Sequence, residues 1–503
     1  MLHDELIHHI HQSFGFVPTA DQEQALQTFA TFLCQRNEHT LMILRGSAGT
    51  GKTSVSGAIV RTMLRLKQKV ALLAPTGRAA KVFSMNAGTA AFTIHRRIYR
   101  QKALEGAFSL APNRCRDTLF MVDEASMIAN EGLRETVFGT GRLLDDLVQF
   151  VYSGQGCRLM LIGDKAQLPP VGEEESPALS PSFMEGYGLT VFHADLNEVL
   201  RQSELSGILF NATTIRQMIT HDEATALPKI RFHGFADIVC VPGDELIEQL
   251  ATSYSQVGMD ETMVVTRSNK RAYIYNQGIR NMVLGREEQL TSGDWLMVVK
   301  NNYYWTELDA AKNKDGLARD ESVAANPQPA DASAANRHDA TPAFIANGDR
   351  AVVQRVRNHR QLYGFNFVDL WLRFPDYDNY ELQLTAMLDT LSTEAPALTK
   401  EQTGRLFEGV MADYADVPTK PERYRRLRQD PYYNALQIKY AYGVTCHKAQ
   451  GGQWAHVYVD QGYMTDDMLT PDYIHWLYTA FTRATEKLFL VNWPKTQTIY
   501  DNK

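Results

Sequence analysis

A phosphate-binding loop constrains the fold of this 503-residue chain more than any other feature. Residues 41–54, LMILRGSAGTGKTS, join an apolar run to the complete pattern G-x-x-x-x-G-K-[ST]. The run at 41–44 predicts a buried strand, and residues 54–67 predict the helix that follows the loop. Glycines let successive backbone N–H groups approach a phosphate, and the helix N-terminus adds the positive end of its dipole. The segment therefore predicts an α/β fold that binds a nucleoside triphosphate.

Two side chains of this loop have chemical roles of their own. Lys52 is expected to bridge the β- and γ-phosphates of ATP, and the Thr53 hydroxyl to ligate Mg²⁺. An ordinary strand-to-helix turn is the alternative, but a full match between a strand and a helix disfavours it. The loop residues assigned to the nucleotide are Gly46, Ser47, Ala48, Gly49, Thr50, Gly51, Lys52, Thr53 and Ser54.

Length and composition limit what the rest of the chain can be. A chain of 503 residues is too long for one core, so two to four domains are expected. The net charge of −7 gives no global basic field, so any nucleic-acid binding must come from local patches. The five cysteines are scattered without a C-x-x-C pair, which argues against structural zinc and disulfides and fits a reducing cytoplasm. The sequence holds no apolar stretch of membrane-spanning length.

Short apolar runs alternate with helical segments over the first two hundred residues, a pattern typical of a parallel sheet covered by helices. Strands are predicted at 41–44, 70–74, 118–122 and 158–162. They end in the polar loops GSAGTGKT, PTGRAAK, DEASM and GDKAQLPPVG. Because open parallel sheets bind ligands at the carboxyl ends of their strands, these loops are expected to form one site.

A second set of strands is predicted at 262–266, 455–459 and 487–491, which indicates a second α/β domain interrupted in sequence. Within the interruption, residues 293–305 and 347–356 predict strands of a hairpin or small barrel. Residues 307–343 are rich in Ala, Asp, Asn, Ser and Pro, which predicts a flexible surface insertion. Basic residues and tyrosines alternate at 420–439, which fits base stacking with phosphate contacts and a solvated charged helix equally well.

Acidic and amide side chains follow two of the predicted strands. Asp123 is expected to hold Mg²⁺, and the adjacent Glu124 to polarise the attacking water. In the GDKAQLPPVG loop, Gln167 is placed to sense the γ-phosphate or the lytic water. Hydrolysis also needs positive charge in the transition state, for which Arg201 and Arg483 are the candidates. Each arginine, taken alone, fits a surface ion pair equally well.

With these motifs in this order, the chain resembles the superfamily 1 nucleic-acid helicases, most closely their RecD- and Dda-like 5′→3′ DNA branch. The resemblance implies two RecA-like P-loop NTPase domains with ATP between them and a small SH3-like β-barrel inserted in the second domain. On this plan the first domain covers 1–200, and the second covers 201–290 and 432–503. The inserted subdomain covers 291–431, with the flexible insertion at 307–343.

The resemblance also implies roles for single residues. Gln22 is similar to the glutamine that reads adenine, and Arg201 and Arg483 are similar to the arginines that contact the γ-phosphate. Gln450 and Gly451, in YAYGVTCHKAQGGQW, belong to a motif that touches nucleotide and DNA together. Gln453 departs from the family, which often has an acidic or small polar residue there. The residues implied to contact DNA are Thr76, Gly77, Arg78, Thr93, His95, Thr445, His447 and Lys448.

The implied function is an ATP-dependent DNA helicase that moves 5′→3′ on single-stranded DNA, in repair, recombination or replication. Residues 96–116 stand where relatives carry a strand-separating pin, with Phe108 as the wedge candidate. A monomer is expected, because one chain holds both halves of the ATP site. Two alternatives stay open: an RNA or RNA–DNA helicase, since backbone contacts seldom distinguish the two sugars, and a nucleotide-switched DNA-binding subunit without unwinding. The set of Glu124, Gln167, Arg201 and Arg483 argues against a mere switch.

Overall fold

The computed structural model describes residues 2–101, 108–131, 139–198, 205–221, 227–320 and 344–499. The chain divides into two compact units, which are described separately below. The first unit comprises Met1–Val265 and Ala449–Lys503, and the second comprises Thr266–Lys448. In the described part of the chain, no helix combines the length and the apolar character that crossing a membrane requires.

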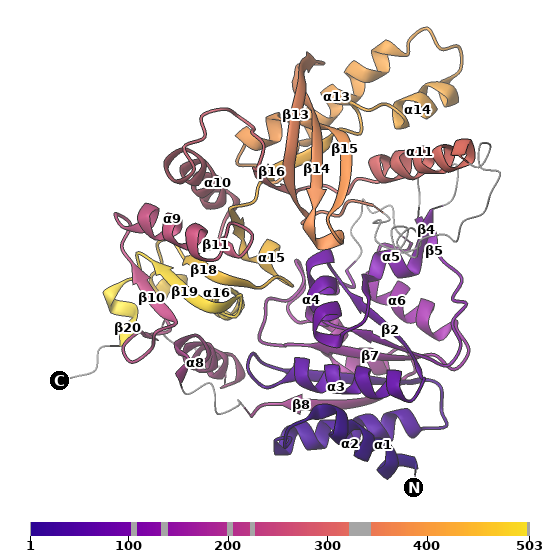
Figure 1. Cartoon of the computed structure of the whole chain (residues 1–503), viewed down its shortest axis with the longest axis vertical. Coiled ribbons are helices and arrows are strands. Elements are labelled where there is room, and N and C mark those ends of the chain that lie inside the picture. The colour runs from indigo at the N-terminus through magenta and orange to yellow at the C-terminus, as the bar shows by residue number, and fades with distance from the viewer. Residues whose placement is uncertain are drawn as a thin grey trace. The chain divides into compact units, whose positions relative to one another are not determined.

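The first unit contains a six-stranded parallel sheet in the order β3-β2-β6-β7-β1-β8. Figure 1 labels β2, β7 and β8 of this sheet. All four strands predicted in the first two hundred residues are confirmed as β1, β2, β6 and β7. Their polar loops follow the carboxyl ends of the strands, as predicted. The strands are β1 (Thr40–Gly46), β2 (Lys69–Ala74), β3 (Ala91–Thr93), β6 (Thr118–Val122), β7 (Arg158–Gly163) and β8 (Thr190–Leu196).

Helices cover both faces of this sheet. Apolar residues of α1 (Leu2–Phe14), α2 (Ala20–Cys34) and α3 (Lys52–Arg65) share one buried core with alternate residues of the strands, such as Met42 and Leu44. The opposite face packs on α6 (Leu143–Tyr152), where the rings of Phe120 and Phe150 meet edge to face at 5.9 Å. Two shorter helices, α4 (Gly77–Ala87) and α5 (Ile94–Ile98), follow β2 and β3.

A second sheet of the same unit contains β10, β19, β18 and β11 in this order. The three strands predicted late in the sequence are confirmed as β11 (Thr262–Thr266), β18 (Trp454–Asp460) and β19 (Ala484–Val491). Strand β10 (Ile238–Val241) pairs in parallel with β19. The rings of Tyr458 and Phe489 stack at 4.3 Å across β18 and β19. The helices of this part are α8 (Gly207–His221), α9 (Leu246–Gln256) and α16 (Pro471–Phe481).

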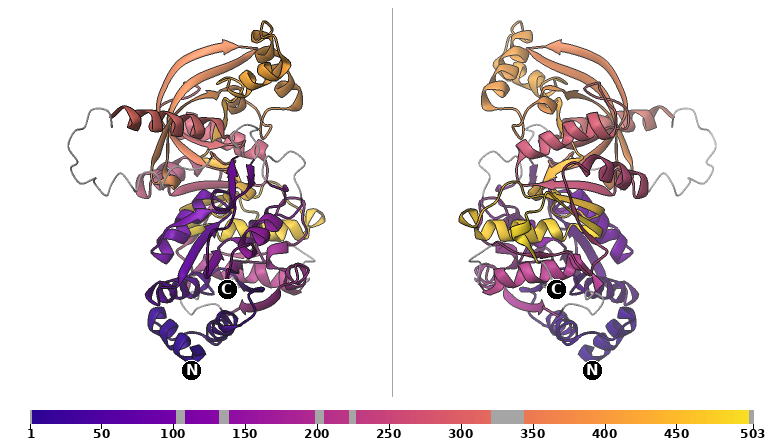
Figure 2. Two further views of the ribbon diagram at one scale, coloured as in Figure 1. Left: turned by 90° about the vertical axis from the view of Figure 1, so that its right-hand side faces the viewer. Right: turned by 90° about the vertical axis from the view of Figure 1, so that its left-hand side faces the viewer.

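The second unit is built on a closed five-stranded barrel, as predicted for a small barrel inserted late in the chain. Figure 2 shows its orange strands and the neighbouring helices from two sides. Apolar residues of α13 (Lys400–Asp413) and α14 (Lys420–Arg428) pack on Phe365 and Phe367 at one end of the barrel. The barrel strands are β12 (Trp295–Val298), β13 (Arg350–Leu362), β14 (Phe365–Phe374), β15 (Tyr380–Met387) and β16 (Leu436–Tyr440).

Two sequence-based boundaries differ from the structure of this unit. The prediction of a flexible insertion from residue 307 onward is wrong for its first part, because helix α11 spans Tyr304–Asp320. Buried Trp305 anchors this helix through a hydrogen bond from Nε1 to the Asn434 carbonyl at 2.9 Å, and alanines and long charged side chains favour it. Residues 321–343 lie outside the described residues. Strand β16, which closes the barrel, lies beyond the predicted subdomain end at 431. The domain boundaries themselves stay a prediction.

A buried charge network holds the start of the barrel. The Asp294 carboxylate is 0% exposed and accepts hydrogen bonds from Arg280 Nε at 3.1 Å, Arg286 Nη1 at 2.5 Å and the Tyr442 hydroxyl at 2.8 Å. Burial alone would raise the pKa of Asp294, but the hydrogen bonds from Arg280, the Thr291 N–H and Tyr442 outweigh it and lower the pKa. The network is therefore expected to contribute to stability only while Asp294 is ionised.

Asp294→Asn should lower the free energy of unfolding by about 3 kcal/mol at pH 7, because it leaves the buried guanidinium of Arg280 and the partly buried one of Arg286 without their counter-ion. Since the pKa of Asp294 is lower in the folded state, this stabilisation is complete above the unfolded pKa and is lost as the pH falls toward the folded pKa. Urea denaturation of the full chain, repeated toward acid pH, measures both effects. The exposed Asp416→Asn is the matched control, and equal midpoints for the two variants would contradict the prediction.

Candidate nucleotide site

The phosphate loop connects the end of β1 to the start of α3. Gly49 and Gly51 have φ angles of 77° and 85°, in the left-handed region that favours glycine. At Gly46, an added Cβ would lie 2.7 Å from Thr50 Oγ1 and 2.9 Å from Lys52 Cγ, so a larger residue does not fit. Glycine is therefore needed at position 46 because there is no space for a side chain, and it is favoured at positions 49 and 51 by the backbone conformation. Without side chains at these positions, the backbone of the loop is open to a phosphate.

Lys52 and Gln22 both hydrogen-bond the carbonyls of this loop. Lys52 Nζ donates to the carbonyls of Gly46 at 2.5 Å and Ser47 at 3.0 Å, and it lies 3.9 Å from Asp164 Oδ2. Gln22 is 2% exposed; its Nε2 donates to the Thr50 carbonyl at 3.0 Å, and its Oε1 accepts from the backbone N–H that opens α2. Gln22 therefore braces the loop, and its contact with adenine stays a prediction.

Asp123 and Glu124 follow directly after β6. Glu124 has a φ of 52°, a left-handed conformation that is uncommon for a non-glycine residue and costs about 1–3 kcal/mol where it is held. The Glu124 N–H donates to Asp123 Oδ1 at 2.9 Å. Burial and the neighbouring Glu124 carboxylate raise the pKa of Asp123 to about 7. A divalent cation beside Asp123 would favour its ionised form, because opposite charge lowers a carboxyl pKa.

The oxygen donors at this end of the sheet fit Mg²⁺. The Thr53 hydroxyl, Asp123 and Glu124 line one cavity with the phosphate loop. Within the described ranges, no three or more His, Cys, Asp or Glu side chains come together in a metal-binding arrangement. Mg²⁺ commonly takes one or two carboxylates and completes its shell with phosphate oxygens and water, so a sparse donor set is suitable for it.

The loop after β7 presents Asp164 and Gln167. Asp164 Oδ1 accepts from the Ala166 N–H at 2.9 Å, and Asp164 Oδ2 accepts from the Tyr478 hydroxyl at 2.7 Å. Gln167 is 6% exposed, and its Oε1 has no hydrogen-bond partner among the described residues. An unpaired buried acceptor costs free energy unless a ligand or water satisfies it. Gln167 Oε1 is therefore available to a molecule in the cavity.

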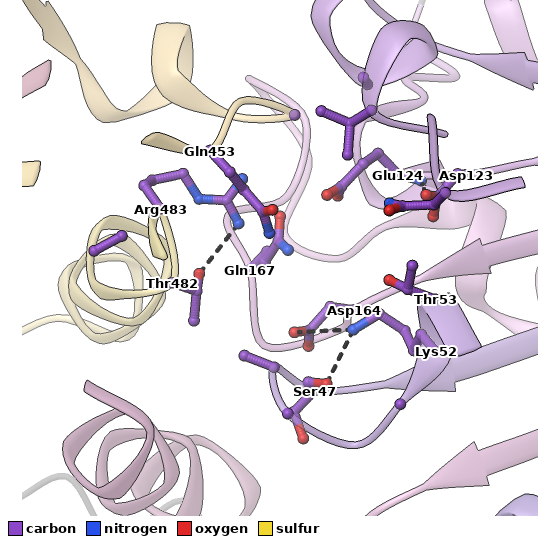
Figure 3. Close-up of a pocket in the computed structure, with 18 of the residues that line it drawn as sticks. Ser47, Lys52, Thr53, Asp123, Glu124, Asp164, Gln167, Gln453, Thr482 and Arg483 are labelled. Carbon is purple, nitrogen blue, oxygen red and sulfur yellow. Dashed lines mark hydrogen bonds and ion pairs between the residues drawn. The ribbon is translucent and has the colours of Figure 1, made fainter. Parts of the chain in front are cut away.

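The cavity has a volume of about 360 Å³ and is lined by residues from both ends of the sequence. Figure 3 shows Arg483, Gln453 and Gln167 grouped on one side, with Lys52 and Thr53 on another. The polar side chains in its lining are Ser47, Lys52, Thr53, Asn86, Asp123, Glu124, Asp164, Gln167, Gln453, Thr482 and Arg483. The structure thus brings Lys52, Glu124, Gln167 and Arg483, four of the five predicted catalytic residues, to one cavity; Arg201 lies outside the described residues.

The Arg483 guanidinium is fixed by three hydrogen bonds. Nε donates to the Thr479 carbonyl at 3.0 Å, Nη1 to the Gly452 carbonyl at 3.1 Å and Nη2 to Thr482 Oγ1 at 3.1 Å. The side chain is 1% exposed, yet it belongs to the cavity lining. Its bonds go to neutral oxygens, so its charge is available to an anion in the cavity.

The predicted nucleotide residues Gln450 and Gly451 lie at or next to the cavity. Gln450 Nε2 donates to the Leu168 carbonyl at 2.7 Å, in the loop that carries Gln167. Gly451 lines the cavity with a φ of 72°, and a Cβ there would lie 3.1 Å from Thr76 Oγ1. The predicted residues that do not line the cavity are Gln22, Gly46, Thr50, Ser54 and Gln450.

The candidate DNA contacts of the first unit have structural roles in their own helices. The hydroxyls of Thr76 and Thr93 accept from the backbone N–H groups that begin α4 and α5, and Gly77 is the first residue of α4. Arg78 Nη2 donates to the Gln453 carbonyl at 2.7 Å and lies 3.4 Å from Glu261. Burial lowers the pKa of His95 to about 4, so it is neutral at pH 7. These DNA contacts stay predictions.

The other candidate DNA contacts lie in the second unit. Thr445 ends β17 (Gly443–Thr445), and His447 and Lys448 lie in the short helix α15 (Cys446–Ala449). Burial lowers the pKa of Lys448 to about 8, and its Nζ donates to Asn347 Oδ1. In the first unit, the segment predicted as a pin contains the antiparallel pair β4 (Tyr99–Gln101) and β5 (Phe108–Leu110), but the Phe108 side chain lies outside the described residues.

Several residues that contact this site were not predicted from the sequence. Arg216 Nη1, from α8, donates to Ser47 Oγ at 2.5 Å. Tyr478, Thr479 and His475, all from α16, hydrogen-bond the phosphate loop or the loop that carries Gln167. The spacing of His475, Tyr478 and Thr479, three and four positions apart in an otherwise apolar helix, could have indicated these three residues. No sequence pattern indicated Arg216.

Two family descriptions match the chain: residues 18–237 match an AAA domain, and residues 440–491 match a UvrD-like helicase C-terminal domain. The ATP-dependent RecD2 DNA helicase of Deinococcus radiodurans is 32% identical over 161 residues, which are 31% of this chain and 20% of that protein. The chain thus spans about a fifth of that relative's length. The uncharacterized protein R530 of Acanthamoeba polyphaga mimivirus is 22% identical over 523 residues, covering 90% of this chain and 95% of that protein.

Among solved structures, the Pif1 helicase from Bacteroides in complex with ADP-AlF3 and ssDNA is similar to this chain with a TM-score of 0.45 and 14% identity, covering 97% of this chain and 95% of its own. The Pif1 helicase from Candida albicans is similar with a TM-score of 0.37 and 14% identity, covering 96% of this chain and 97% of its own. Of the two family ranges, the first contains Lys52 and the second contains Arg483.

Proposed function

We propose that this chain is a superfamily 1 helicase of the RecD type, an ATP-dependent DNA helicase that moves 5′→3′ along single-stranded DNA. The observation that carries the proposal is the single cavity lined by Lys52, Glu124, Gln167 and Arg483. The protein works as a monomer in the cytoplasm, in DNA repair, recombination or replication.

The residues of the cavity divide the work of hydrolysis among them. The ammonium of Lys52 holds the β- and γ-phosphates, and the N–H groups of the loop orient them. Thr53 and Asp123 would hold Mg²⁺, which would neutralise charge on the phosphate oxygens. Glu124 accepts a proton from the attacking water, and Gln167 orients that water or the γ-phosphate. Arg483, together with Arg201, stabilises the charge of the transition state.

Contacts within the first unit give a path from this cavity to the predicted DNA contacts. A Cβ added at Gly451 would lie 3.1 Å from Thr76, which caps α4, and 3.2 Å from Ala79 of α4, and Arg78 of the same helix is bonded to the Gln453 carbonyl. Gln453 and Gly451 both line the cavity. A change in the bound nucleotide that shifts this segment is therefore transmitted to α4, which is the coupling that translocation requires.

Unwinding of duplexes with a single-stranded tail tests the activity and the direction together. We expect duplex with a 5′ tail to be unwound in the presence of ATP and Mg²⁺, and duplex with a 3′ tail to stay intact, because each cycle moves the motor toward the 3′ end of the strand it holds. Strand displacement is followed by the separation of a fluorophore from its quencher. Preferential unwinding of the 3′-tailed duplex would exclude the proposed polarity.

ATPase stimulation and strand displacement together distinguish the two alternative functions. An RNA or RNA–DNA helicase would show ATPase stimulation by single-stranded RNA that equals or exceeds the stimulation by DNA of the same sequence. A nucleotide-switched binding subunit would bind DNA in an ATP-dependent way and displace no strand from either tailed duplex. The carboxylate of Glu124 in the cavity favours the hydrolytic motor, because a switch does not need a group that activates water.

A further inference from the structure

Helix α16 presents a row of polar side chains to the nucleotide site. His475, Tyr478 and Thr479 have the i, i+3, i+4 spacing that places side chains on one face of a helix. All three hydrogen-bond residues far away in the sequence, in the phosphate loop or in the loop after β7. Arg483 follows two residues after the end of the same helix.

The backbone of the loop after β7 is held from two sides. Thr479 Oγ1 accepts from the Leu168 N–H at 2.8 Å, and His475 Nδ1 lies 2.9 Å from the Ala166 carbonyl. Gln450 Nε2 donates to the Leu168 carbonyl at 2.7 Å. These bonds fix the residues on both sides of Gln167, while its own Oε1 is without a partner in the described structure. The position of α16 therefore determines where Gln167 stands in the cavity.

The Tyr478 hydroxyl joins this loop to the phosphate loop. It donates to Asp164 Oδ2 at 2.7 Å and accepts from the Ala48 N–H at 2.9 Å. The side chain is 1% exposed, and burial and the Asp164 carboxylate raise its pKa well above the ordinary value. The hydroxyl thus keeps its proton and can donate to Asp164 throughout the usual pH range. One atom connects the phosphate loop, the Gln167 loop and the helix that leads to Arg483.

We propose that Tyr478 is a positioning residue for ATP turnover, whose hydroxyl holds the phosphate loop in register with Gln167 and Arg483. This inference rests on the proposed ATPase function. When α16 moves, Tyr478 moves the Asp164 carboxylate and the Ala48 N–H with it, so the hydrolytic groups assemble together. The residue does not touch the reacting atoms; it sets the distance between the parts that do. A link to the predicted DNA contacts runs through Gln450, which bonds the Leu168 carbonyl of the same loop and precedes Gly451, the residue next to Thr76.

Tyr478→Phe removes the hydroxyl and keeps the ring. We expect kcat with saturating single-stranded DNA to fall about tenfold, the scale of one hydrogen bond to a charged group, and KM for ATP to change less than about threefold. The ratio of kcat with DNA to kcat without DNA should fall as well, because the bond that transmits the movement of α16 is lost. Phosphate release measures these quantities, and a thermal melt reports folding.

Tyr473→Phe is the matched control, because Tyr473 is buried in the same helix and its hydroxyl donates to Gln461 Oε1, outside the cavity lining. It should keep the wild-type kcat and DNA stimulation. Asp164→Asn weakens the same bond from its other end and should also lower kcat. A wild-type kcat and DNA stimulation for Tyr478→Phe, or an equal fall in Tyr473→Phe, would overturn this role while leaving the proposed function intact. A wild-type protein without ATPase activity would overturn both.

Discussion

Lys52→Ala should reduce ATP hydrolysis to background and abolish unwinding with it. The Lys52 ammonium donates to the carbonyls of Gly46 and Ser47 and lies 3.9 Å from Asp164, within the phosphate loop. Removing it takes away the cation that we propose to hold the β- and γ-phosphates. Phosphate release with saturating ATP and single-stranded DNA measures the loss, and strand displacement from 5′-tailed duplex follows it.

The control for this variant is Lys69→Ala. Lys69 is exposed at the start of β2, the end of the strand opposite the phosphate edge, and its Nζ donates to the Arg116 carbonyl. It should keep the wild-type rate, and both variants should melt at the wild-type temperature. A folded Lys52→Ala protein that hydrolyses ATP at the wild-type rate would refute the assigned site.

Local sequence patterns predicted the strands of the first unit, because an apolar run of a few residues and the strand that it forms have the same length. The apolar runs at 41–44 and 118–122 are buried strands, and each ends at a loop whose residues reach one cavity. A parallel sheet gathers the carboxyl ends of its strands at one edge, so the order of the motifs was enough to predict that they meet. Gly49 and Gly51 of the phosphate loop have positive φ angles, which favour glycine at these positions.

Long-range partners could not be predicted in this way. Tyr478 lies in the apolar sequence WLYTAF and looks like a core residue, yet its hydroxyl bonds Ala48 and Asp164, which are more than three hundred residues away. Gln22 and Arg78 were assigned to ligands, and the structure gives both of them protein partners. A motif identifies a residue as part of a site, but the partner that it holds depends on tertiary packing, which a single sequence does not encode locally.

Composition misled the interpretation of one segment. Residues from 307 onward lack aromatics and are rich in small polar residues, but α11 continues through Asp320 because Trp305 anchors its first turn in the second unit. Alanines and long charged side chains also favour a helix, so the composition of this segment was compatible with a helix that is held at one end by Trp305. In the same way, β16 joins the barrel by pairing with β12 and β15, which no property of its own five residues indicates.

Arg483→Ala should lower the rate of ATP hydrolysis about 10³-fold while ATP still binds, because the guanidinium acts on the charge that develops in the transition state. Arg483 is held by the carbonyls of Thr479 and Gly452 and by Thr482, so its position in the cavity is fixed before ATP arrives. A preorganised cation costs no reorganisation when the charge develops. Single-turnover phosphate release gives the rate, and the fluorescence of a bound nucleotide analogue gives the affinity.

Two further variants separate charge from packing at this position. Arg483→Lys keeps the charge but cannot make the same set of fixed hydrogen bonds, so we expect a rate between those of wild type and Arg483→Ala. Arg65→Ala removes an exposed arginine at the far end of α3 and should leave the rate unchanged. If Arg483→Ala loses nucleotide affinity and hydrolysis in equal proportion, the guanidinium contributes to binding alone, and the transition-state role is excluded. If Arg483→Lys matches Arg483→Ala, the geometry of the guanidinium, and not its charge, is what hydrolysis requires.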